Sequence, residues 1–294
     1  MLAIVIPYYK INYFEETLKS LAEQTDKRFK VYVGNDSSEN DPSALIQKYS
    51  SELNIKYKKF DTNLGSFSLV RQWNRCLDLL ENETWVMILG DDDVVSCNMV
   101  EAFYLNYDTF KTSYSVIRFA TYKINDVSQI YSELYTHVEI ENCTDIIVNQ
   151  KRSSLSEYVF RKDKIDTIKF KELPLAWYSD LLAVLEFSDF GSIFSINSAH
   201  LKIRISENSI SGKNDNLVQK ENAKFLFYKY ILENANTKLN KETKEIIESK
   251  INKIYINDKK NISRLRIILI LYLRKFKFEA IFKLFKSLII NIQN

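Results

Sequence analysis

The sequence predicts an α/β protein with a central, mostly parallel sheet flanked by helices, followed by a helical appendage at the C-terminal end. Short apolar runs rich in β-branched residues alternate with segments whose apolar residues recur at helical spacing. The chain has 294 residues, 46% of them hydrophobic, which is enough for a large core. It has only 5 glycines and 3 prolines, so an all-β fold rich in tight turns is not expected.

The first hundred residues contain the clearest alternation. Strands are predicted at Leu2–Ile6, Lys30–Val33, Ile55–Phe60 and Trp85–Leu89, and the continuous apolar runs of the first and the fourth are typical of buried strands. Helices are predicted at Tyr13–Gln24, at Pro42–Glu52 with Asp41 as its N-cap, and from Asn63–Ser66 to about Leu80. Strands that alternate with helices in this way form βαβ units, so we expect a parallel sheet.

The remainder of the chain has a mixed pattern. Strands are predicted at Val116–Thr121, Ser192–Ile196 and Leu201–Ile205, and a helix at Leu175–Phe187. Two charged helical regions are predicted at Val218–Ile256 and Ser263–Ile292. These two regions form the expected C-terminal appendage.

Four polar turns follow the predicted strands or open the next helix. They are Pro7–Asn12, Asn35–Ser38, Asn63–Ser66 and Asp91–Asp93. Ligands of open α/β sheets bind beyond the carboxyl ends of the strands. The turns therefore predict one site at this edge of the sheet.

Three consecutive carboxylates, Asp91, Asp92 and Asp93, follow the fourth strand. Adjacent carboxylates repel one another unless a cation lies among them. Mg²⁺ and Mn²⁺ prefer oxygen ligands and often bind phosphate oxygens as well. The cluster predicts a metal–diphosphate site, with an acidic turn that caps a helix as the alternative.

The bulk properties exclude several classes of protein. Cys76, Cys97 and Cys143 are widely spaced, with no disulfide framework or zinc spacing, so we expect a reducing, cytoplasmic compartment. The first residues lack the basic region of a signal peptide. The longest apolar run, Ile267–Leu273, is far shorter than the ~20 residues that span a bilayer.

Several segments together resemble glycosyltransferase family 2, whose members have the GT-A fold. The matching segments are Ile4–Lys10 (IVIPYYK), Leu18–Thr25 (LKSLAEQT), Val31–Ser38, Asn63–Gly65 and Ile88–Asp93. The resemblance implies a catalytic domain over residues 1–212, with a nucleotide-binding half (1–95) and an acceptor half (96–212). A helical region with a basic amphipathic end then occupies residues 213–294.

The resemblance also implies which residues bind the sugar donor. Pro7 and Tyr9 are expected at the base and ribose, and Asp36 at the base. Asn63 and Gly65 are expected close to the donor, and Arg71 at the diphosphate. Two of these residues also have a purely structural alternative. Tyr9 is then an aromatic that packs against its neighbours, and Arg71 is a solvent-exposed residue on the surface of its helix.

The metal motif departs from the family pattern, because Gly90 stands where many members have an aspartate. In one register Asp92 is the metal ligand, Asp91 its neighbour at the ribose or metal, and Asp93 a supporting acid. In the other register Asp91 and Asp93 are the functional pair. We retain all three as metal-site residues, with Mn²⁺ or Mg²⁺ as the expected cofactor.

Asp180 lies where the family places its catalytic base, although Ser179 replaces the usual glutamate before it. A desolvated carboxylate suits the removal of a hydroxyl proton. The alternatives are a helix N-terminal acid at Asp180, favoured by the helix dipole, and Asp189 as the base. Trp177 and Tyr178 then line the acceptor side or belong to the core.

A segment after the expected base resembles a family segment near the diphosphate. Arg204 is expected to contact the phosphates, and Ser209 and Ser211 to cap or hydrogen-bond there.

The C-terminal segment is strongly basic. From Asn261 onwards seven Lys or Arg residues accompany one acid, Glu279. Apolar bulk with clustered cations predicts contact with a membrane surface through residues 262–292, peripheral on the inner face of the plasma membrane. The alternative is a helix packed on the domain. No nucleic-acid partner is expected, because the net charge is only +3.

The leading hypothesis is an inverting, metal-assisted glycosyltransferase. It would move a sugar from a nucleoside diphosphate sugar, with UDP favoured, to a hydroxyl of a saccharide or lipid-linked saccharide in a growing cell-surface polysaccharide or glycolipid. One alternative is a non-catalytic sugar-nucleotide-binding or interaction module on the same fold. The other is a nucleotidyltransferase, although Pro7–Lys10 stands where such enzymes carry a Gly-rich loop.

Overall fold

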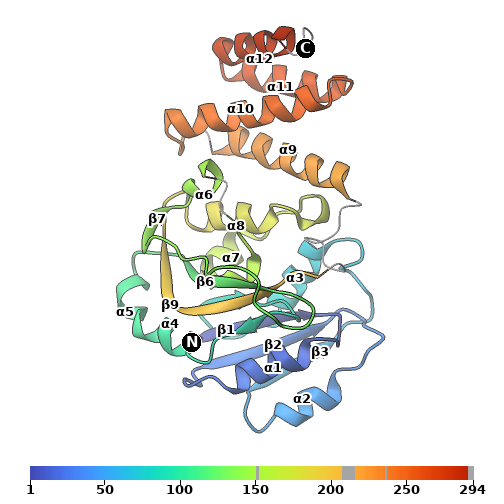
Figure 1. Cartoon of the computed structure of the whole chain (residues 1–294), viewed down its shortest axis with the longest axis vertical. Helices are drawn as coiled ribbons and strands as arrows, with labels where there is room; N and C mark the ends of the chain where they lie inside the picture. The colour runs from blue at the N-terminus through green and yellow to red at the C-terminus, as the bar shows by residue number, and fades with distance from the viewer. Residues whose placement is uncertain (150–151, 207–215, 236, 291–294) are drawn as a thin grey trace. The chain divides into compact units, whose positions relative to one another are not determined.

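A computed structural model describes residues 1–149, 152–206, 216–235 and 237–290 of the chain (Figure 1). The chain divides into two compact units. Unit 1 comprises residues 1–172 and 179–215, and unit 2 comprises residues 173–178 and 216–294.

In the described part of unit 1, nine strands form one sheet in the order β3-β2-β1-β4-β8-β6-β9-β5, with β7 paired to β9. Its first four strands are parallel to one another: β3 (Ile55–Lys59), β2 (Phe29–Asn35), β1 (Leu2–Tyr8) and β4 (Trp85–Ile88). These are the strands predicted from the sequence. β1 and β4 are buried along their length apart from the half-buried Pro7, which explains why their sequences are continuous apolar runs.

The second part of the sheet mixes both strand directions. It contains β8 (Tyr158–Arg161), β6 (Val116–Ile124), β9 (Ser192–Arg204), β5 (Val94–Val95) and β7 (Ile140–Asn142). β9 runs parallel to β6, whereas β8, β5 and β7 pair antiparallel with their neighbours. The predicted fold class is confirmed.

The prediction of two separate strands between residues 192 and 205 is wrong, because β9 is continuous. The pairing with β6 shifts from Phe119↔Ile196 to Ala120↔His200, so three residues of β9 bulge out. Asn197 lies in this bulge and exchanges hydrogen bonds with the backbone of His137, at 3.0 and 2.8 Å. These polar residues interrupt the apolar pattern without ending the strand.

Helices cover the sheet of unit 1 (Figure 1). They are α1 (Phe14–Ala22), α2 (Ser43–Tyr49), α3 (Leu69–Leu77), α4 (Met99–Leu105), α5 (Tyr107–Phe110), α6 (Asp145–Val148), α7 (Lys162–Ile168) and α8 (Ser179–Phe187), with a short 3₁₀ turn η1 (Leu155–Glu157). The predicted N-cap at Asp41 is wrong by one residue, since Pro42 takes that position. Asp41 instead accepts hydrogen bonds from the backbone N–H and hydroxyl of Ser43, at 3.0 and 2.6 Å.

The predicted helix at Leu175–Phe187 begins four residues later than expected, at Ser179. The preceding residues form a 3₁₀ turn, η2 (Pro174–Ala176), with positive φ angles at Leu175 (59°), Ala176 (54°) and Tyr178 (69°). An α-helix cannot continue through such backbone angles.

Unit 2 contains four further described helices: α9 (Leu217–Asn234), α10 (Lys241–Asn257), α11 (Ile262–Arg274) and α12 (Phe278–Ile290). Each of the two predicted helical regions is therefore a pair of helices. Asn240 caps α10 by accepting from the N–H of Thr243 at 2.8 Å, and Asn261 caps α11 by accepting from the N–H of Arg264 at 3.1 Å. Within the described ranges, no helix is both long and apolar enough to cross a membrane.

Candidate active site

The predicted turns meet where the parallel strands end. β1 lies between β2 and β4, and its last residue, Tyr8, is paired with Asn35 at the end of β2. Asp91, in the turn after β4, accepts hydrogen bonds from the backbone N–H groups of Tyr9 (2.7 Å) and Lys10 (2.8 Å) through Oδ2. The Asp91 carboxylate thus joins the acidic turn to the first turn of the chain.

The two neighbouring tyrosines of the first turn have different environments. Tyr8 is fully buried and donates to the carbonyl of Asn40 at 2.8 Å, so it belongs to the core. The Tyr9 side chain is 43% exposed at the same edge of the sheet. Pro7 is half-buried and pairs with Gly34 of β2. Of these residues, Tyr9 offers an accessible ring on which a nucleotide base can stack.

Asp36 is buried, and its carboxylate is engaged by protein groups. Oδ1 accepts from the N–H of Leu64 (2.7 Å) and Oδ2 from the N–H of Gly65 (2.8 Å), and the Arg75 guanidinium binds Oδ1 as well. A Cβ at Gly65 would lie 2.4 Å from Asp36 Oδ2, so only glycine fits here. Asp36 therefore ties the end of β2 to the turn at Asn63–Gly65.

Asn63 stabilises this turn from within, because its Oδ1 accepts from the N–H of Ser66 at 2.9 Å. Arg71, expected at the diphosphate, has a side chain that is 68% exposed and pairs with Glu172 at 3.3 Å. Arg75, one helical turn further along α3, binds Asp36 and the carbonyl of Thr62 (2.7 Å). Sequence reasoning missed Arg75, although its i, i+4 spacing from Arg71 places both on one face of the helix.

Asp93 supports the acidic turn from behind. It is buried, and its oxygens accept from the Ser156 hydroxyl (2.5 Å) and from the N–H of Arg204 (2.9 Å). Ser156 also accepts from the N–H of Gly90 at 3.0 Å. Both carboxylate oxygens of Asp93 thus have protein partners.

The Arg204 side chain is fully buried behind the same turn. Its Nε donates to the carbonyl of Asp92 at 3.0 Å, and its Nη2 pairs with Glu16 at 2.9 Å. Arg204 therefore braces the turn, and the expected contact of its guanidinium with phosphates is wrong. Ser209 and Ser211 lie outside the described residues.

Asp92 has the most available carboxylate of the three. It is half-buried, and its carboxylate hydrogen-bonds to no other described residue. A Cβ at Gly90 would lie 3.0 Å from both Asp92 Oδ1 and Asp93 Oδ2, so the glycine leaves room for the carboxylates. Asp92 is thus the acid most exposed to a ligand.

The pKa values of all three acids are raised. Burial is the largest cause in each case, and it raises the pKa of Asp91 to about 6 and that of Asp93 to about 7, with the charge of Asp92 adding to both. Burial also raises the pKa of Asp92, against the opposing charges of Arg204 and Lys10. A cation at this turn would relieve the cost of holding three buried acids in ionised form.

The carboxylate oxygens of this turn fit a hard divalent cation only if a bound phosphate group or water completes the coordination of the ion. The described residues contain no cluster of three or more His, Cys, Asp or Glu side chains arranged as a complete metal site. Asp92 can offer its carboxylate oxygens and Asp91 its Oδ1. Mg²⁺ and Mn²⁺ are commonly held by one or two carboxylates together with water and substrate phosphates, so this smaller set is compatible with such an ion.

Asp180 is the second residue of α8 and keeps partial exposure. Burial, with the charge of Glu157 adding to it, raises the pKa of Asp180 to about 6, while the Leu181 N–H and Arg152 oppose the shift. The three positive φ angles at Leu175, Ala176 and Tyr178 lie directly before it. Backbone strain of this kind persists at functional sites where the surrounding structure enforces it.

A buried ion network connects the acidic turn with the surroundings of Asp180. Glu157 is fully buried and accepts from Arg118 Nε (2.9 Å) and Arg152 Nη1 (2.8 Å). Its neighbour in η1, Ser156, is the residue that binds Asp93. Sequence reasoning missed this network, because its partners are far apart in the chain and no local pattern marks them.

The two aromatic residues before α8 belong to unit 2. The ring of Tyr178 lies 4.8 Å from that of Phe227, so Tyr178 packs in the core of that unit. Lys220 lies over the Trp177 ring at 4.7 Å. The contact with the Phe227 ring favours the core alternative for the half-buried Tyr178.

The chain has the GT-A fold, in which a parallel half-sheet with polar turns and an acidic turn at its carboxyl edge is continued by a mixed half-sheet. The chain belongs to glycosyl transferase family 2, whose family model matches residues 3–170. No protein with a curated description matches the chain in sequence. The family assignment favours glycosyl transfer over the nucleotidyltransferase alternative.

Solved structures of TarS from S. aureus have the same fold. TarS 1-349 matches with a TM-score of 0.64 and 17% identity over 88% of this chain and 73% of TarS 1-349. Its complex with UDP-GlcNAc matches with a TM-score of 0.66 and 18% identity over 86% and 72%. A longer TarS structure matches at 18% identity over 86% of this chain but only 43% of its own length.

Proposed function

We propose that the protein transfers a sugar, with inversion at the anomeric carbon, from a UDP-sugar to a hydroxyl group of an acceptor. Two observations carry this proposal. The available acid Asp92 lies in a turn that Ser156 of η1 holds through Asp93. A second acid with a raised pKa, Asp180, lies within the electrostatic influence of Glu157, the neighbour of Ser156 in η1. An available carboxylate such as Asp92 can hold a cation that stabilises the charge of the leaving diphosphate. A carboxylate with a raised pKa such as Asp180 can remove the proton of the acceptor hydroxyl.

In the proposed reaction the acceptor oxygen attacks the anomeric carbon from the face opposite the diphosphate. The new C–O bond forms as the bond to the leaving phosphate oxygen breaks, and UDP departs with the bonding electrons. Asp180 takes the hydroxyl proton. A carboxylate with a pKa of about 6 is ionised at neutral pH and is a stronger base than an ordinary aspartate.

We assign the donor contacts to the edge formed by β1, β2 and β4. Tyr9 and Pro7 provide the surface for the nucleotide base. Asp36, bound to Arg75, holds the Asn63–Gly65 turn near the donor. Arg71 can contact the diphosphate only if its side chain leaves Glu172. A UDP donor is supported by the TarS structures solved with UDP and with UDP-GlcNAc.

Mn²⁺ or Mg²⁺ would be held by Asp92, with Asp91 as its neighbour. Such an ion, when bound, neutralises charge on the leaving diphosphate. Asp91 and Asp93 also keep the turn in place through their hydrogen bonds to Tyr9, Lys10 and Ser156.

The acceptor is proposed to be a saccharide or a lipid-linked saccharide of a growing cell-surface polysaccharide or glycolipid, at the cytoplasmic side of the membrane. Residues 262–292 are the proposed membrane contact. A non-catalytic module on the same fold remains the alternative, because it would keep the donor contacts and lose only the function of Asp180.

The experiment measures thermal unfolding with UDP-, GDP-, CDP- and dTDP-sugars, each with Mn²⁺ or with EDTA, and donor hydrolysis under the same conditions. A donor at one hundred times its Kd should stabilise the folded state by about 2.7 kcal/mol. For a unit of this size that corresponds to a rise in Tm of about 5–10 °C.

The expected result is metal-dependent stabilisation by the UDP-sugar that is lost in Asp92→Asn and retained in Asp180→Asn, while hydrolysis is lost in both. Stabilisation without hydrolysis in the wild type, under conditions that also include simple saccharide acceptors, would favour the non-catalytic module. No response to any nucleotide would refute the donor site.

A further inference from the structure

Helix α12 exposes a continuous row of large apolar side chains. Phe278, Phe282, Phe285 and Ile289 are 64%, 69%, 46% and 59% exposed. Their spacing of four, three and four residues puts them on one face of the helix, which we call the apolar stripe. On the other side of α12, Ala280 and Leu284 are buried within unit 2.

Two further exposed apolar residues precede α12 in the sequence. Phe276 is 81% exposed with a positive φ of 53°, and Leu273 at the end of α11 is 52% exposed. Single exposed apolar residues are ordinary on a protein surface, whereas four on one face of a helix, with two more just before it, are typical of a surface that contacts another molecule or a membrane.

The Lys and Arg side chains of α11, α12 and the turn between them fall into two groups, those with a carboxylate partner and those without one. Lys277, Lys283 and Arg264 pair with Glu248, Glu279 and Asp258, respectively. Arg266, Arg274, Lys275 and Lys286 are exposed, and none forms an ion pair with a described acid. Arg274 and Lys275 directly precede Phe276, and Lys286 is one turn from both Phe282 and Ile289.

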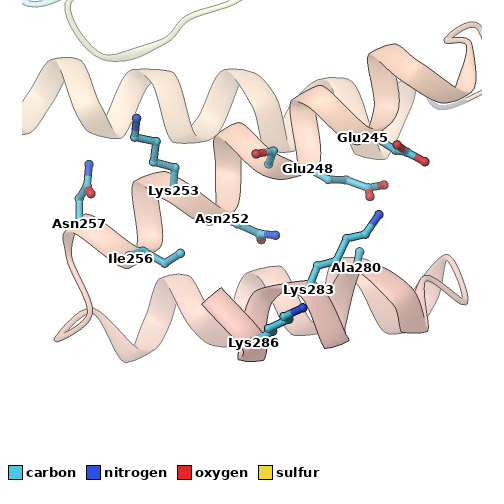
Figure 2. Close-up of a pocket in the computed structure, with 10 residues that line it drawn as sticks. Glu245, Glu248, Asn252, Lys253, Ile256, Asn257, Ala280, Lys283 and Lys286 are labelled. Carbon is cyan, nitrogen blue, oxygen red and sulfur yellow. The ribbon is translucent and has the colours of Figure 1, made fainter. Parts of the chain in front are cut away.

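The flank of α12 that faces α10 is mainly polar, although Phe278 in the first turn of α12 lines a pocket with Lys241 and Lys244 of α10. A pocket between these helices is lined by Glu245, Glu248, Lys253 and Lys283, with Lys286 at the α12 side (Figure 2). The helix therefore has three sectors: one buried in unit 2, one polar, and one apolar and exposed. This is the arrangement of a helix that lies in a lipid–water interface.

We propose that the apolar stripe, with Phe276 and Leu273, inserts into the surface of a bilayer that contains anionic lipids, and that Arg274, Lys275 and Lys286 bind the lipid phosphates. This inference rests on the membrane contact proposed above and assigns its residues and its class of lipid. Charge complementarity selects this occupant. A second copy of the chain, docked symmetrically through the stripe, would bring the unpaired cations of both copies together, whereas anionic head groups attract them.

The test uses the full chain without any sugar donor, so that its result does not depend on the proposed enzymatic function. Sedimentation with vesicles measures binding to phosphatidylcholine alone and to phosphatidylcholine mixed with phosphatidylglycerol. Light scattering measures the oligomeric state in the absence of vesicles. Circular dichroism checks that each variant is folded.

Three double variants are compared. Phe282→Ser with Phe285→Ser removes the middle of the stripe, and burial of each phenyl ring should account for about tenfold in binding. Arg274→Gln with Lys286→Gln removes two cations, each of which should account for about fivefold on anionic vesicles. Leu217→Ser with Val218→Ser on α9 is the matched control, because these residues are 61% and 80% exposed outside the stripe.

The expected result is binding to the anionic vesicles that falls about a hundredfold in the phenylalanine variant and about 25-fold in the cation variant, and is unchanged in the control. In addition, Phe282→Trp should show a blue-shifted fluorescence difference on vesicles. The proposal is overturned if the wild type ignores anionic vesicles, or if the stripe variant binds as well as the wild type. A dimer that the stripe variant abolishes, without vesicle binding, would identify a second copy as the occupant.

Discussion

Asp180→Asn should stabilise the folded protein while abolishing glycosyl transfer. Burial raises the pKa of the Asp180 carboxyl from 3.8 to about 6. This difference of about two pKa units corresponds to a cost of about 3 kcal/mol for keeping the group ionised in the folded state at neutral pH. Asp180 keeps partial exposure, so we expect water to relieve part of the cost and the variant to gain about 1–2 kcal/mol.

The pH dependence of this difference has a definite sign. Below the unfolded pKa of 3.8 the wild-type carboxyl is protonated in both states and resembles the amide. As the pH rises towards about 6, the folded wild type loses stability relative to the variant, and above it the difference is constant. Transfer by the wild type should decline below the same pH, because the protonated acid cannot accept the acceptor proton.

The assay is denaturant unfolding of the wild type and of Asp180→Asn at a series of pH values between 3.8 and about 6 and at neutral pH. Glycosyl transfer is measured in parallel. Asp189→Asn is the control, since Asp189 is exposed in a turn with a positive φ that asparagine tolerates, and its stability should be unchanged. A variant that is less stable than the wild type at neutral pH, or that retains transfer, would refute the assignment of Asp180 as a desolvated base.

Three further changes test other parts of the site. Gly65→Ala would place a Cβ 2.4 Å from Asp36 Oδ2. The free energy of unfolding, measured by thermal unfolding, should fall by about 1–3 kcal/mol, and donor binding should weaken. Unchanged donor affinity would show that this turn lies away from the donor. Arg118→Met leaves the fully buried Glu157 with one cation instead of two. The free energy of unfolding in urea should fall by about 3–5 kcal/mol. A fall below about 1 kcal/mol would mean that Arg152 alone compensates the charge of Glu157. EDTA should abolish transfer and Mn²⁺ should restore it, and full activity in EDTA would exclude the proposed role of the ion at Asp92.

The parallel half of the sheet was predictable because each strand carries its own signal. β1 and β4 are buried on both faces, so their sequences are uninterrupted apolar runs, and the polar turns that follow them mark the edge where ligands bind. β5 and β7 escaped prediction because they have two and three residues and exist only through pairing with β9. Contacts over such distances leave no local pattern in the sequence.

The acidic turn shows the same limit at the level of single residues. The sequence indicates that Asp91, Asp92 and Asp93 belong to a site, but it leaves two registers open. Their different environments come from groups 63 to 111 residues away along the chain, among them the N–H of Tyr9, the hydroxyl of Ser156 and the N–H of Arg204. Only the folded structure distinguishes two engaged carboxylates from the available one, Asp92.

The site holds its acids at a cost to the stability of the fold. Asp91, Asp92, Asp93 and Asp180 all have pKa values raised chiefly by burial, and none is neutralised by a direct ion pair with Lys or Arg among the described residues. Buried carboxylates normally find such a partner, as Asp36 does in Arg75. At the acidic turn a divalent ion and the donor would supply the missing charge compensation, whereas at Asp180 the acceptor proton would supply it. In the proposed reaction, the same unfavourable electrostatics that weaken the fold would favour binding of a metal–diphosphate donor near Asp92 and removal of a proton at Asp180.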